Sequence, residues 1–387
     1  MRASLRVAEP ETLAVTLAAD ATLSYPFVFH ALGDTTVVST RNRVAPLFVE
    51  HTRLQWSAAD ISDALPEGHY GGMQFERVGG AWPRHVVGVL ADSRPRSATV
   101  RKYVRWSGKT WNAWKAAPAD RGIYVAFALR SDGRVLGLQH GDMWSGRIED
   151  FEPRIDVFPA GEAPKVPAGY VPVSLATDSR GFLFAIASER DDHRARLLAW
   201  GPGGGDAAVV DLPEVAGFAP RAGDVRVIAG RDGKGVWIGG GVGEEDDAAW
   251  VPYLVRRADR KWLAWEAPDP LRGMVGSIGH RAERPGLWFT TSARHGPTNS
   301  RWVAGRGDVP LVGKLWRAGA AMDLHEVTVA LDRKPDKAPP SGFGTRTIAF
   351  TGDRLWIAME IDAEIVDMDW QTLPSHLLAT AVIEPAP

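Results

Sequence analysis

The sequence contains no cysteine, so no disulfide bond, thiolate nucleophile or cysteine-ligated metal site is available to it. It has no basic excess either: 45 Lys and Arg stand against 47 Asp and Glu, which argues against an electrostatic nucleic-acid binder. No run approaches about 18 consecutive apolar residues, so no membrane-spanning helix is expected. Glu9 and Glu11 interrupt the N-terminal stretch, which is untypical of a secretion signal. We therefore expect a soluble, cytoplasmic protein.

Glycine, proline and tryptophan are plentiful, with 41, 27 and 16 residues. Such a composition predicts many turns and many large flat side chains, and helical periodicity is scarce. Apolar residues alternate by two rather than by three and four, which is typical of β-strands and excludes a helical solenoid. The fold class predicted is all-β.

A short pattern recurs along the chain: a polar turn, an apolar run and then a small residue, as in RDGKGVWIGGGV (231–242). Successive small residues lie 48 to 54 positions apart, except for a last step of 68 that contains Gly/Pro-rich insertions. We call these small residues the register marks. They are Ser39, Gly88, Gly137, Ala185, Gly239, Thr290 and Ala358.

Each copy has the same surroundings. An alternating apolar segment precedes a tight turn such as SDGR, DSRG or TGDR, where glycine supplies a positive φ at little steric cost. The strand with the register mark follows, and two further strands can be assigned after it. Each repeat of about fifty residues thus predicts a four-stranded antiparallel meander. A single meander cannot bury both of its faces, but seven meanders arranged radially can cover one another. We therefore predict a seven-bladed β-propeller over residues 25–387.

Residues 1–24 precede the first blade. The segment TLAVTLA alternates Leu13, Val15 and Leu17 as a strand would. We expect it to add to the sheet of the last blade and close the ring. A loosely packed extension is the alternative.

The run DGKGVWIGGG resembles the repeats of the two-component-regulator type of bacterial propeller, which carry an Asp-Gly-x-Gly-x-Trp-Ile-Gly signature. The resemblance implies a propeller with a sensing or docking role. The architecture expected is WD40-like, but the WD40 signature itself is absent. Three Trp residues at one register, Trp237, Trp288 and Trp356, are interpreted as packing groups between blades.

Function is expected on the loops that join the second and third strands, because the opposite turns are short. Arginines form a basic sector in the first two blades, and carboxylates form an acidic sector in the fifth; such a pattern can orient a protein partner. The candidate partner-binding residues are Arg41, Arg43, Arg94, Arg96, Asp191, Asp192, His193, Glu244, Glu245, Asp246, Asp247 and His295.

Signs of catalysis are sparse. The inner strands offer only His30, Glu76, Arg226 and His280 as polar candidates, and the sequence contains no P-loop, nucleophile elbow or zinc spacing. We expect no cofactor, no metal and no catalytic residue. The function favoured is a non-enzymatic scaffold for protein–protein interaction.

Two alternatives remain open. One is a propeller enzyme of the lactonase, lyase or glycosidase kind, which would act on a small molecule in the central funnel. The other is a lectin-like binder of glycans, which would need exposed aromatic rings. The candidates for such rings are Trp82, Trp144, Trp250 and Trp302.

Overall fold

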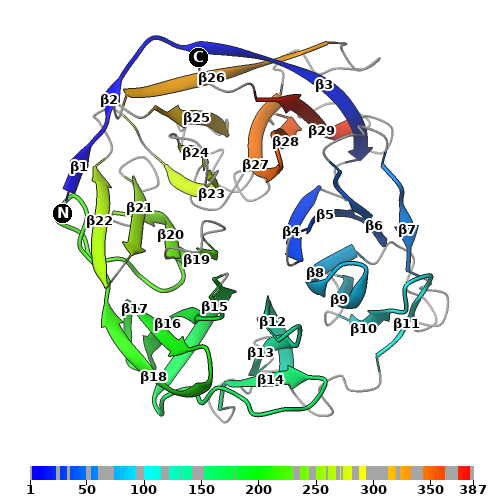
Figure 1. The fold of residues 1–387 in the computed structure, drawn as a ribbon. Coiled ribbons are helices and arrows are strands. Elements are labelled where there is room, and N and C mark those ends of the chain that lie inside the picture. The colour runs from blue at the N-terminus through cyan, green and yellow to red at the C-terminus, as the bar shows by residue number, and fades with distance from the viewer. Residues whose placement is uncertain are drawn as a thin grey trace. The chain divides into compact units, whose positions relative to one another are not determined.

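The computed structural model consists of β-strands joined by turns and loops (Figure 1). It describes residues 2–22, 27–32, 35–48, 54–59, 74–92, 100–114, 122–130, 132–141, 152–178, 180–229, 236–243, 250–258, 260–266, 271, 273–280, 287–292, 313–319, 323–332, 343–361 and 374–383. Within these residues no helix has the length and apolar character needed to span a membrane. The cytoplasmic location stays a prediction.

Contacts divide the chain into two compact units. The middle unit comprises residues 28–47 and 54–210, and the terminal unit comprises residues 1–27, 48–53 and 211–387.

The middle unit contains four antiparallel sheets. The first is β4 (Val28–Leu32), β5 (Thr35–Thr40), β6 (Arg43–Pro46) and β7 (Ser57–Ala58). The second is β8 (Gln74–Ala81), β9 (Arg84–Asp92), β10 (Val100–Trp106) and β11 (Trp111–Ala113). The third is β12 (Gly122–Leu129), β13 (Val135–Gly141) and β14 (Arg154–Phe158). The fourth is β15 (Tyr170–Thr177), β16 (Leu183–Glu189), β17 (Asp192–Gly201) and β18 (Gly204–Asp211).

The terminal unit contains two sheets. One is β19 (Val225–Ala229), β20 (Val236–Val242), β21 (Val251–Ala258) and β22 (Lys261–Glu266), extended by β1 (Arg2–Ser4). The other has nine strands. They are β23 (Met274–His280), β24 (Leu287–Ser292), β25 (Lys314–Ala318), β26 (Asp323–Leu331), β3 (Glu11–Thr22), β29 (Pro374–Val382), β28 (Arg354–Ile361), β27 (Phe343–Thr351) and, off this path beside β26, β2 (Arg6–Val7).

The chain has a β-propeller fold with antiparallel meanders as blades, as the sequence predicts. In the middle unit the first strands of successive sheets, β4, β8, β12 and β15, contact one another in that order. In the terminal unit β23 contacts β20 on one side and β27 on the other. Within each unit, neighbouring runs of strands therefore bury a face against one another.

The expectation of seven separate four-stranded blades is wrong. The described residues form five separate blades of three to five strands and one nine-stranded sheet. The cause is β3, which pairs in parallel with β26 and antiparallel with β29 and so merges two runs of strands into one sheet. The third blade also departs from the expectation, because only three of its strands lie in the described residues.

The turns between first and second strands follow the prediction from Asp and Gly. Gly133 and Gly181 have φ values of 81° and 84°, in the left-handed region that glycine enters without steric cost. Asp178 supports its turn through the side chain, whose Oδ1 accepts hydrogen bonds from the backbone N–H groups of Arg180 and Phe182. The local sequence is sufficient to produce these turns.

A β-bulge near the start of the first strand recurs in five meanders. The register shifts there, so one residue has no partner on the second strand. The bulged residues are Glu76, Val125, Val173, Gly276 and Arg346. The bulges change the direction of side chains and carbonyl groups at this end of each first strand.

Packing between neighbouring runs of strands depends on a first-strand glycine in each unit. A Cβ on Gly79 of β8 would lie 2.1 Å from Cβ of Phe127 on β12, and one on Gly279 of β23 would lie 2.7 Å from the ring of Phe350 on β27. Only glycine permits these strands to approach so closely.

The second-strand tryptophans are buried, as predicted. Trp237 stacks on Trp265 with 4.7 Å between ring centroids, and Trp288 packs edge-on against Phe350 of the neighbouring run of strands. Trp356 is fully buried as well. Trp250, considered above as an exposed ring, is only 2% exposed, so it cannot serve as a surface platform for a sugar.

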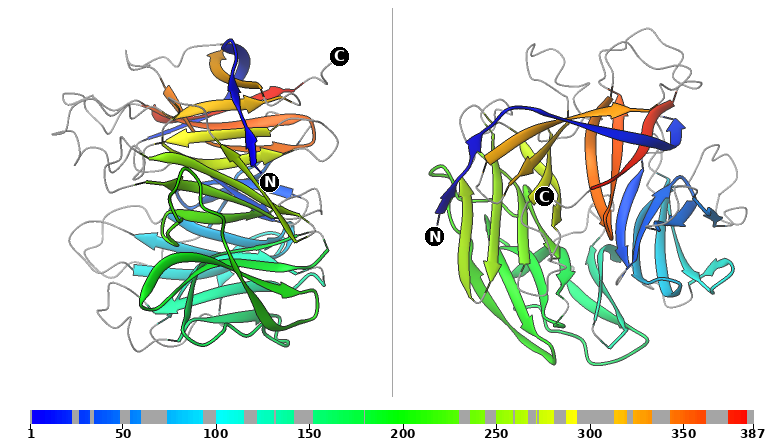
Figure 2. Two further views of the ribbon diagram at one scale, coloured as in Figure 1. Left: turned by 90° about the vertical axis from the view of Figure 1, so that its left-hand side faces the viewer. Right: turned by 45° about the horizontal axis from the view of Figure 1, so that its top comes forward.

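The N-terminal segment follows the outer strands of the terminal unit (Figures 1 and 2). β1 pairs in parallel with β22, β2 with β26, and β3 lies between β26 and β29. Val15 and Leu17 are buried in the core of the nine-stranded sheet, while Leu13 packs at its margin. The segment thus joins the sheet that holds the last strands of the chain. Ring closure and the boundary after residue 24 stay predictions.

Side chains strengthen this attachment. Glu11 forms an ion pair with Arg317, and its Oε1 lies 3.1 Å from Nδ1 of His325. The hydrogen bond and charge of Arg317 hold the pKa of Glu11 below its usual value. The carboxylate of Asp332 accepts the backbone N–H of Leu17 at 3.1 Å.

Replacing Gly79 with Ala should destabilise the protein by about 1–3 kcal/mol, because the new methyl group overlaps Phe127 and the backbones must separate. Urea unfolding followed by tryptophan fluorescence measures the change. The matched control is Gly201→Ala, since a Cβ at Gly201 meets nothing within 4 Å. Equal midpoints for both variants would contradict the role assigned to Gly79.

Removing residues 1–24 should lower the melting temperature, because the deletion exposes the edges of β26 and β29 and part of the buried core. Differential scanning calorimetry of the shortened chain tests this. Thr12→Ala, at an exposed position of β3, serves as the control for a harmless change in the same strand. An unchanged melting temperature after truncation would show that the segment does not stabilise the sheet.

Candidate functional site

Five of the predicted partner-binding residues lie in the part of the chain that the structure describes. Arg41 lies in the turn between β5 and β6, and Arg43 begins β6. Asp191, Asp192 and His193 lie at the turn between β16 and β17, and all five residues are exposed. Both turns join second and third strands, as the sequence predicts. The other candidates, Arg94, Arg96, Glu244, Glu245, Asp246, Asp247 and His295, lie outside the described residues.

The backbone of Arg41 connects its turn to the next sheet. Its φ of 49° lies in the left-handed region, and its carbonyl oxygen accepts the N–H of Phe75 at 2.9 Å. Phe75 belongs to β8 of the next sheet, two residues before Arg77. This bond therefore ties the arginine-bearing turn to the start of that strand.

Asp192 stabilises its own turn. Its Oδ1 accepts the N–H of Arg194 at 2.9 Å, and its carboxylate lies 4.0 Å from the guanidinium of Arg196. Nearby, Arg190 pairs with Glu152 at 2.7 Å and the hydroxyl of Tyr170 donates to Glu189. The charges around this turn are largely paired internally.

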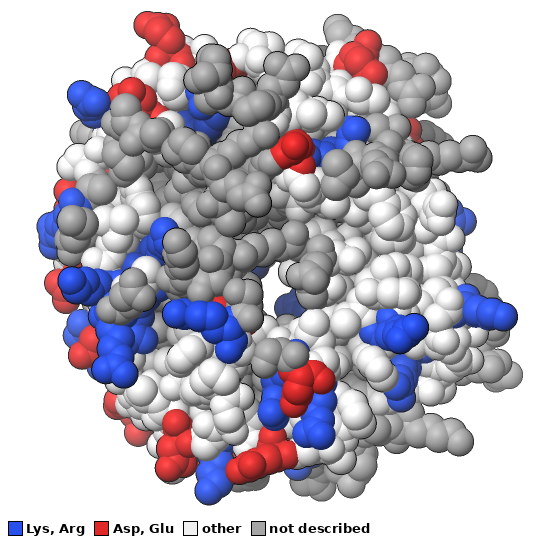
Figure 3. Space-filling model, viewed as in Figure 1, with Lys and Arg blue, Asp and Glu red and all other residues white. Residues whose placement is uncertain are grey.

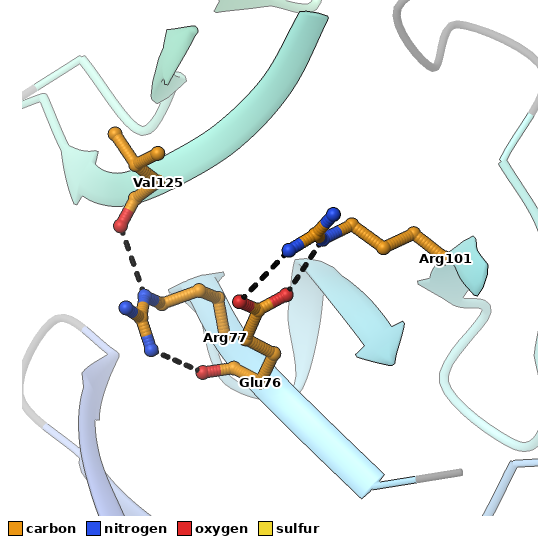
Figure 4. Close-up of polar contacts among 4 residues, drawn as sticks. All are labelled: Glu76, Arg77, Arg101 and Val125. Atoms are coloured by element: carbon orange, nitrogen blue, oxygen red, sulfur yellow. Dashed lines mark hydrogen bonds and ion pairs between the residues drawn. The ribbon is translucent and has the colours of Figure 1, made fainter. Parts of the chain in front are cut away.

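A cluster of charged side chains occupies the start of β8 (Figure 4). Glu76, the bulged residue, accepts two hydrogen bonds from the guanidinium of Arg101 on β10, at 3.0 and 3.5 Å. The guanidinium of Arg77 points the other way: its Nε donates to the carbonyl oxygen of Val125 on β12 at 2.9 Å, and its Nη1 donates to the carbonyl of Glu76 at 2.7 Å. The cluster thus connects the second blade to the third.

Glu76 is an inner-strand candidate predicted from the sequence, whereas Arg77 and Arg101 are not among those candidates. An alternating strand would direct Glu76 and Arg77 to opposite faces, and the bulge changes both directions. Arg101 lies 25 positions from its partner, and no local pattern indicates that pairing. Among the other inner-strand candidates, Arg226 is exposed at the surface of β19, and His280 ends β23.

His30 on β4 is the buried member of this neighbourhood. Its Nε2 lies 2.7 Å from Oγ of Ser39, the register mark on β5. Burial, assisted by the positive charge of Arg77, lowers the pKa of His30 from 6.5 to about 3. His30 is therefore neutral at physiological pH. Ser39 is only 1% exposed, so this pair is not placed to attack a substrate.

The terminal unit contains a second polar cluster. Arg346, the bulged residue of β27, lies 3.1 Å from the carboxylate of Glu360 on β28. The hydroxyl groups of Ser277 and Thr290 lie 3.0 Å apart, and they contact the N–H of Ile348 and the carbonyl of Arg346. Here the arginine is neutralised by a carboxylate that is 4% exposed. The cluster joins the runs of strands that begin with β23 and β27.

Neither cluster has the composition of a metal site. Within the part of the chain that the structure describes, no three His, Asp or Glu side chains are grouped so that they could hold a metal ion. The chemistry available in the middle unit is that of an exposed cation beside a neutral histidine. Such a group binds anions.

The buried state of His30 predicts a pH dependence. The folded protein holds this side chain neutral down to about pH 3, whereas the unfolded chain protonates it below about 6.5. Lowering the pH from 7 to 4 should therefore reduce the free energy of unfolding, by at most about 1.4 kcal/mol per pH unit for this group. The variant His30→Gln should show a shallower decline in urea unfolding experiments. Equal slopes for the variant and the wild type would contradict the assignment.

Comparisons with known proteins give structural matches only. No protein-family model and no curated protein sequence matches the chain. The WD40 domain of Neurospora crassa Pan2 has a TM-score of 0.49 and 8% identity, covering 98% of each chain. Kuenenia stuttgartiensis hydrazine synthase has a TM-score of 0.47 and 12% identity, covering 94% of this chain and 98% of its own. The Cps50 (Swd1) β-propeller domain of Myceliophteria thermophila has a TM-score of 0.47 and 9% identity, covering 95% and 99%.

Proposed function

We propose that the protein is a non-enzymatic binding scaffold that docks a partner protein on the edge of the middle unit where second and third strands are joined. The observation that carries this proposal is the position of Arg41 and Arg43. Both are exposed at the turn between β5 and β6, and the backbone of Arg41 is fixed to β8. A charged turn that is held in place by a rigid sheet is a common form of recognition surface.

The charge of this region supports the proposal. Residues 27–114 carry eleven Lys and Arg against seven Asp and Glu, whereas the whole chain has a net charge of −2. In Figure 3 the charged atoms visible over β8 to β11, at the lower right, are those of Lys and Arg. A local excess of one sign on a chain of opposite net charge favours one orientation of a partner during association.

The burial of the serine–histidine pair on the inner strands favours binding over catalysis. Ser39 and His30, which form this pair in the described part of the middle unit, are buried within their own sheet. The charged groups beside it are held by backbone carbonyls and by one another. Such an arrangement can recognise a partner without chemical change to it.

The test is affinity capture from the native lysate with two baits, followed by identification and purification of the retained protein and titration calorimetry. One bait is the wild type, and the other has Arg41, Arg43, Arg94 and Arg96 all changed to Glu. We expect a stoichiometric partner that binds the wild type and loses at least about tenfold in affinity for the variant, because like charges then face each other.

A control variant separates position from net charge. It carries Glu at Arg84 of β9, Arg105 of β10, Lys109 in the turn after β10 and Arg134 directly before β13, and these changes alter the net charge equally. The control should bind as the wild type does. A partner that both variants lose equally, or no partner at all, would contradict the proposal.

A further inference from the structure

The positive charge of Arg77 has no carboxylate partner among the described residues. Glu76, its neighbour in sequence, is engaged by Arg101 instead. The two hydrogen bonds of Arg77 go to backbone carbonyl groups, which carry dipoles but no net charge. These bonds fix the guanidinium in place and leave its charge uncompensated.

The guanidinium is also accessible. Arg77 is exposed, and its remaining N–H groups have no acceptor within the described part of the chain. A fixed planar guanidinium with free N–H groups matches the geometry of a carboxylate, which it can bind through parallel hydrogen bonds. Because the side chain is already ordered, binding an anion costs little conformational entropy.

A second arginine in the chain differs from Arg77 in having a carboxylate partner. Arg346 and Arg77 each stand directly before the residue that pairs with a register mark, although Arg346 is the bulged residue of its strand and Arg77 pairs with Val89. Arg346 is neutralised by Glu360, two positions after the mark Ala358. The corresponding residue of the second blade, two positions after Gly88, is Leu90, which is buried and apolar. The middle unit therefore holds this arginine without the internal carboxylate that its counterpart has.

Within the described residues, the first strands on either side of β8 add no negative charge. β12 has no charged residue, and the nearby side chain of β4 is the neutral His30. Arg41 and Arg43 lie at the turn that is bonded to β8, and β10 contributes Arg101 and Lys102. The one carboxylate at this end of β8 is that of Glu76, already paired.

We infer that Arg77 is an anion-recognition point that takes a side-chain carboxylate from an acidic segment of a partner protein. The inference rests on the proposed scaffold function and specifies the chemistry of the partner. An acidic peptide fits better than a nucleic acid, because one fixed guanidinium suits a single carboxylate, whereas nucleic-acid affinity needs many phosphate contacts. The half-buried Val125, the bulged residue of β12 whose carbonyl oxygen Arg77 contacts, can accommodate an apolar side chain beside it.

The test measures binding of fluorescein-labelled hexaglutamate by fluorescence anisotropy at low ionic strength, with hexaglutamine as the uncharged control peptide. We expect the wild type to bind hexaglutamate but not hexaglutamine. Arg77→Gln should weaken binding by at least about tenfold, which corresponds to one charge-assisted hydrogen-bonded pair. Arg105→Gln, at an exposed arginine near the opposite end of the same sheet, should bind within twofold of the wild type.

A second measurement uses the wild type alone and therefore does not depend on the folding of any variant. Adding hexaglutamate should shift the backbone amide NMR signals of Glu76, Arg77 and Val78 more than those of the distant turn at Gly133. Unchanged signals at these three residues, or equal binding by Arg77→Gln, would overturn the inference. Tighter Arg77-dependent binding of a single-stranded oligothymidylate would overturn the choice of an acidic peptide.

Failure of the inference and failure of the proposed function give different results. If the captured partner depends on Arg41 and Arg43 while hexaglutamate does not depend on Arg77, the scaffold function stands and the inference is wrong. If hexaglutamate binds through Arg77 but the charge-reversed bait loses no partner, the anion site stands and the proposed docking surface is wrong.

Discussion

The close approach of first strands in neighbouring sheets is the contact on which the rest of the structure depends. A meander is apolar on both faces, so it is stable only when another sheet covers each face. Gly79 against Phe127 and Gly279 against Phe350 bring the backbones near enough for the aromatic rings to fill the space between the sheets. Tryptophans on the second strands, such as Trp237 and Trp288, continue the same packing outward. The conformations of the polar groups are set by this packing.

The recurring bulges connect packing to chemistry. A regular strand would use the carbonyls of Glu76 and Val125 within its own alternating pattern, and the bulges instead release them as acceptors for the guanidinium of Arg77. In the terminal unit the carbonyl of Arg346, at another bulge, accepts the hydroxyl of Thr290. The same backbone irregularity thus links neighbouring runs of strands in both units. In the middle unit it fixes a charge that has no carboxylate partner among the described residues.

The N-terminal segment covers two sheet edges that would otherwise be unpaired. Without β3, the edges of β26 and β29 would present free N–H and C=O groups, which favour aggregation. β3 covers both edges, parallel to one and antiparallel to the other, and its apolar residues complete the core beneath them. A strand of twelve residues is long enough to serve both neighbours in succession.

Periodicity in the sequence determined the all-β class, the meander repeat and the tight turns, because alternation, Asp-Gly turns and recurring small residues depend on contacts within about fifty residues. It also placed Arg41, Arg43 and the Asp191–His193 group at turns between second and third strands. The merging of two runs of strands by β3 was decided by tertiary structure, since the pairing joins residues more than 300 positions apart. The site around Arg77 was decided in the same way. Its bulge and the pairing of Glu76 with Arg101 arise when the strands of the second blade pair, and its bond to Val125 arises when the next blade packs against that one.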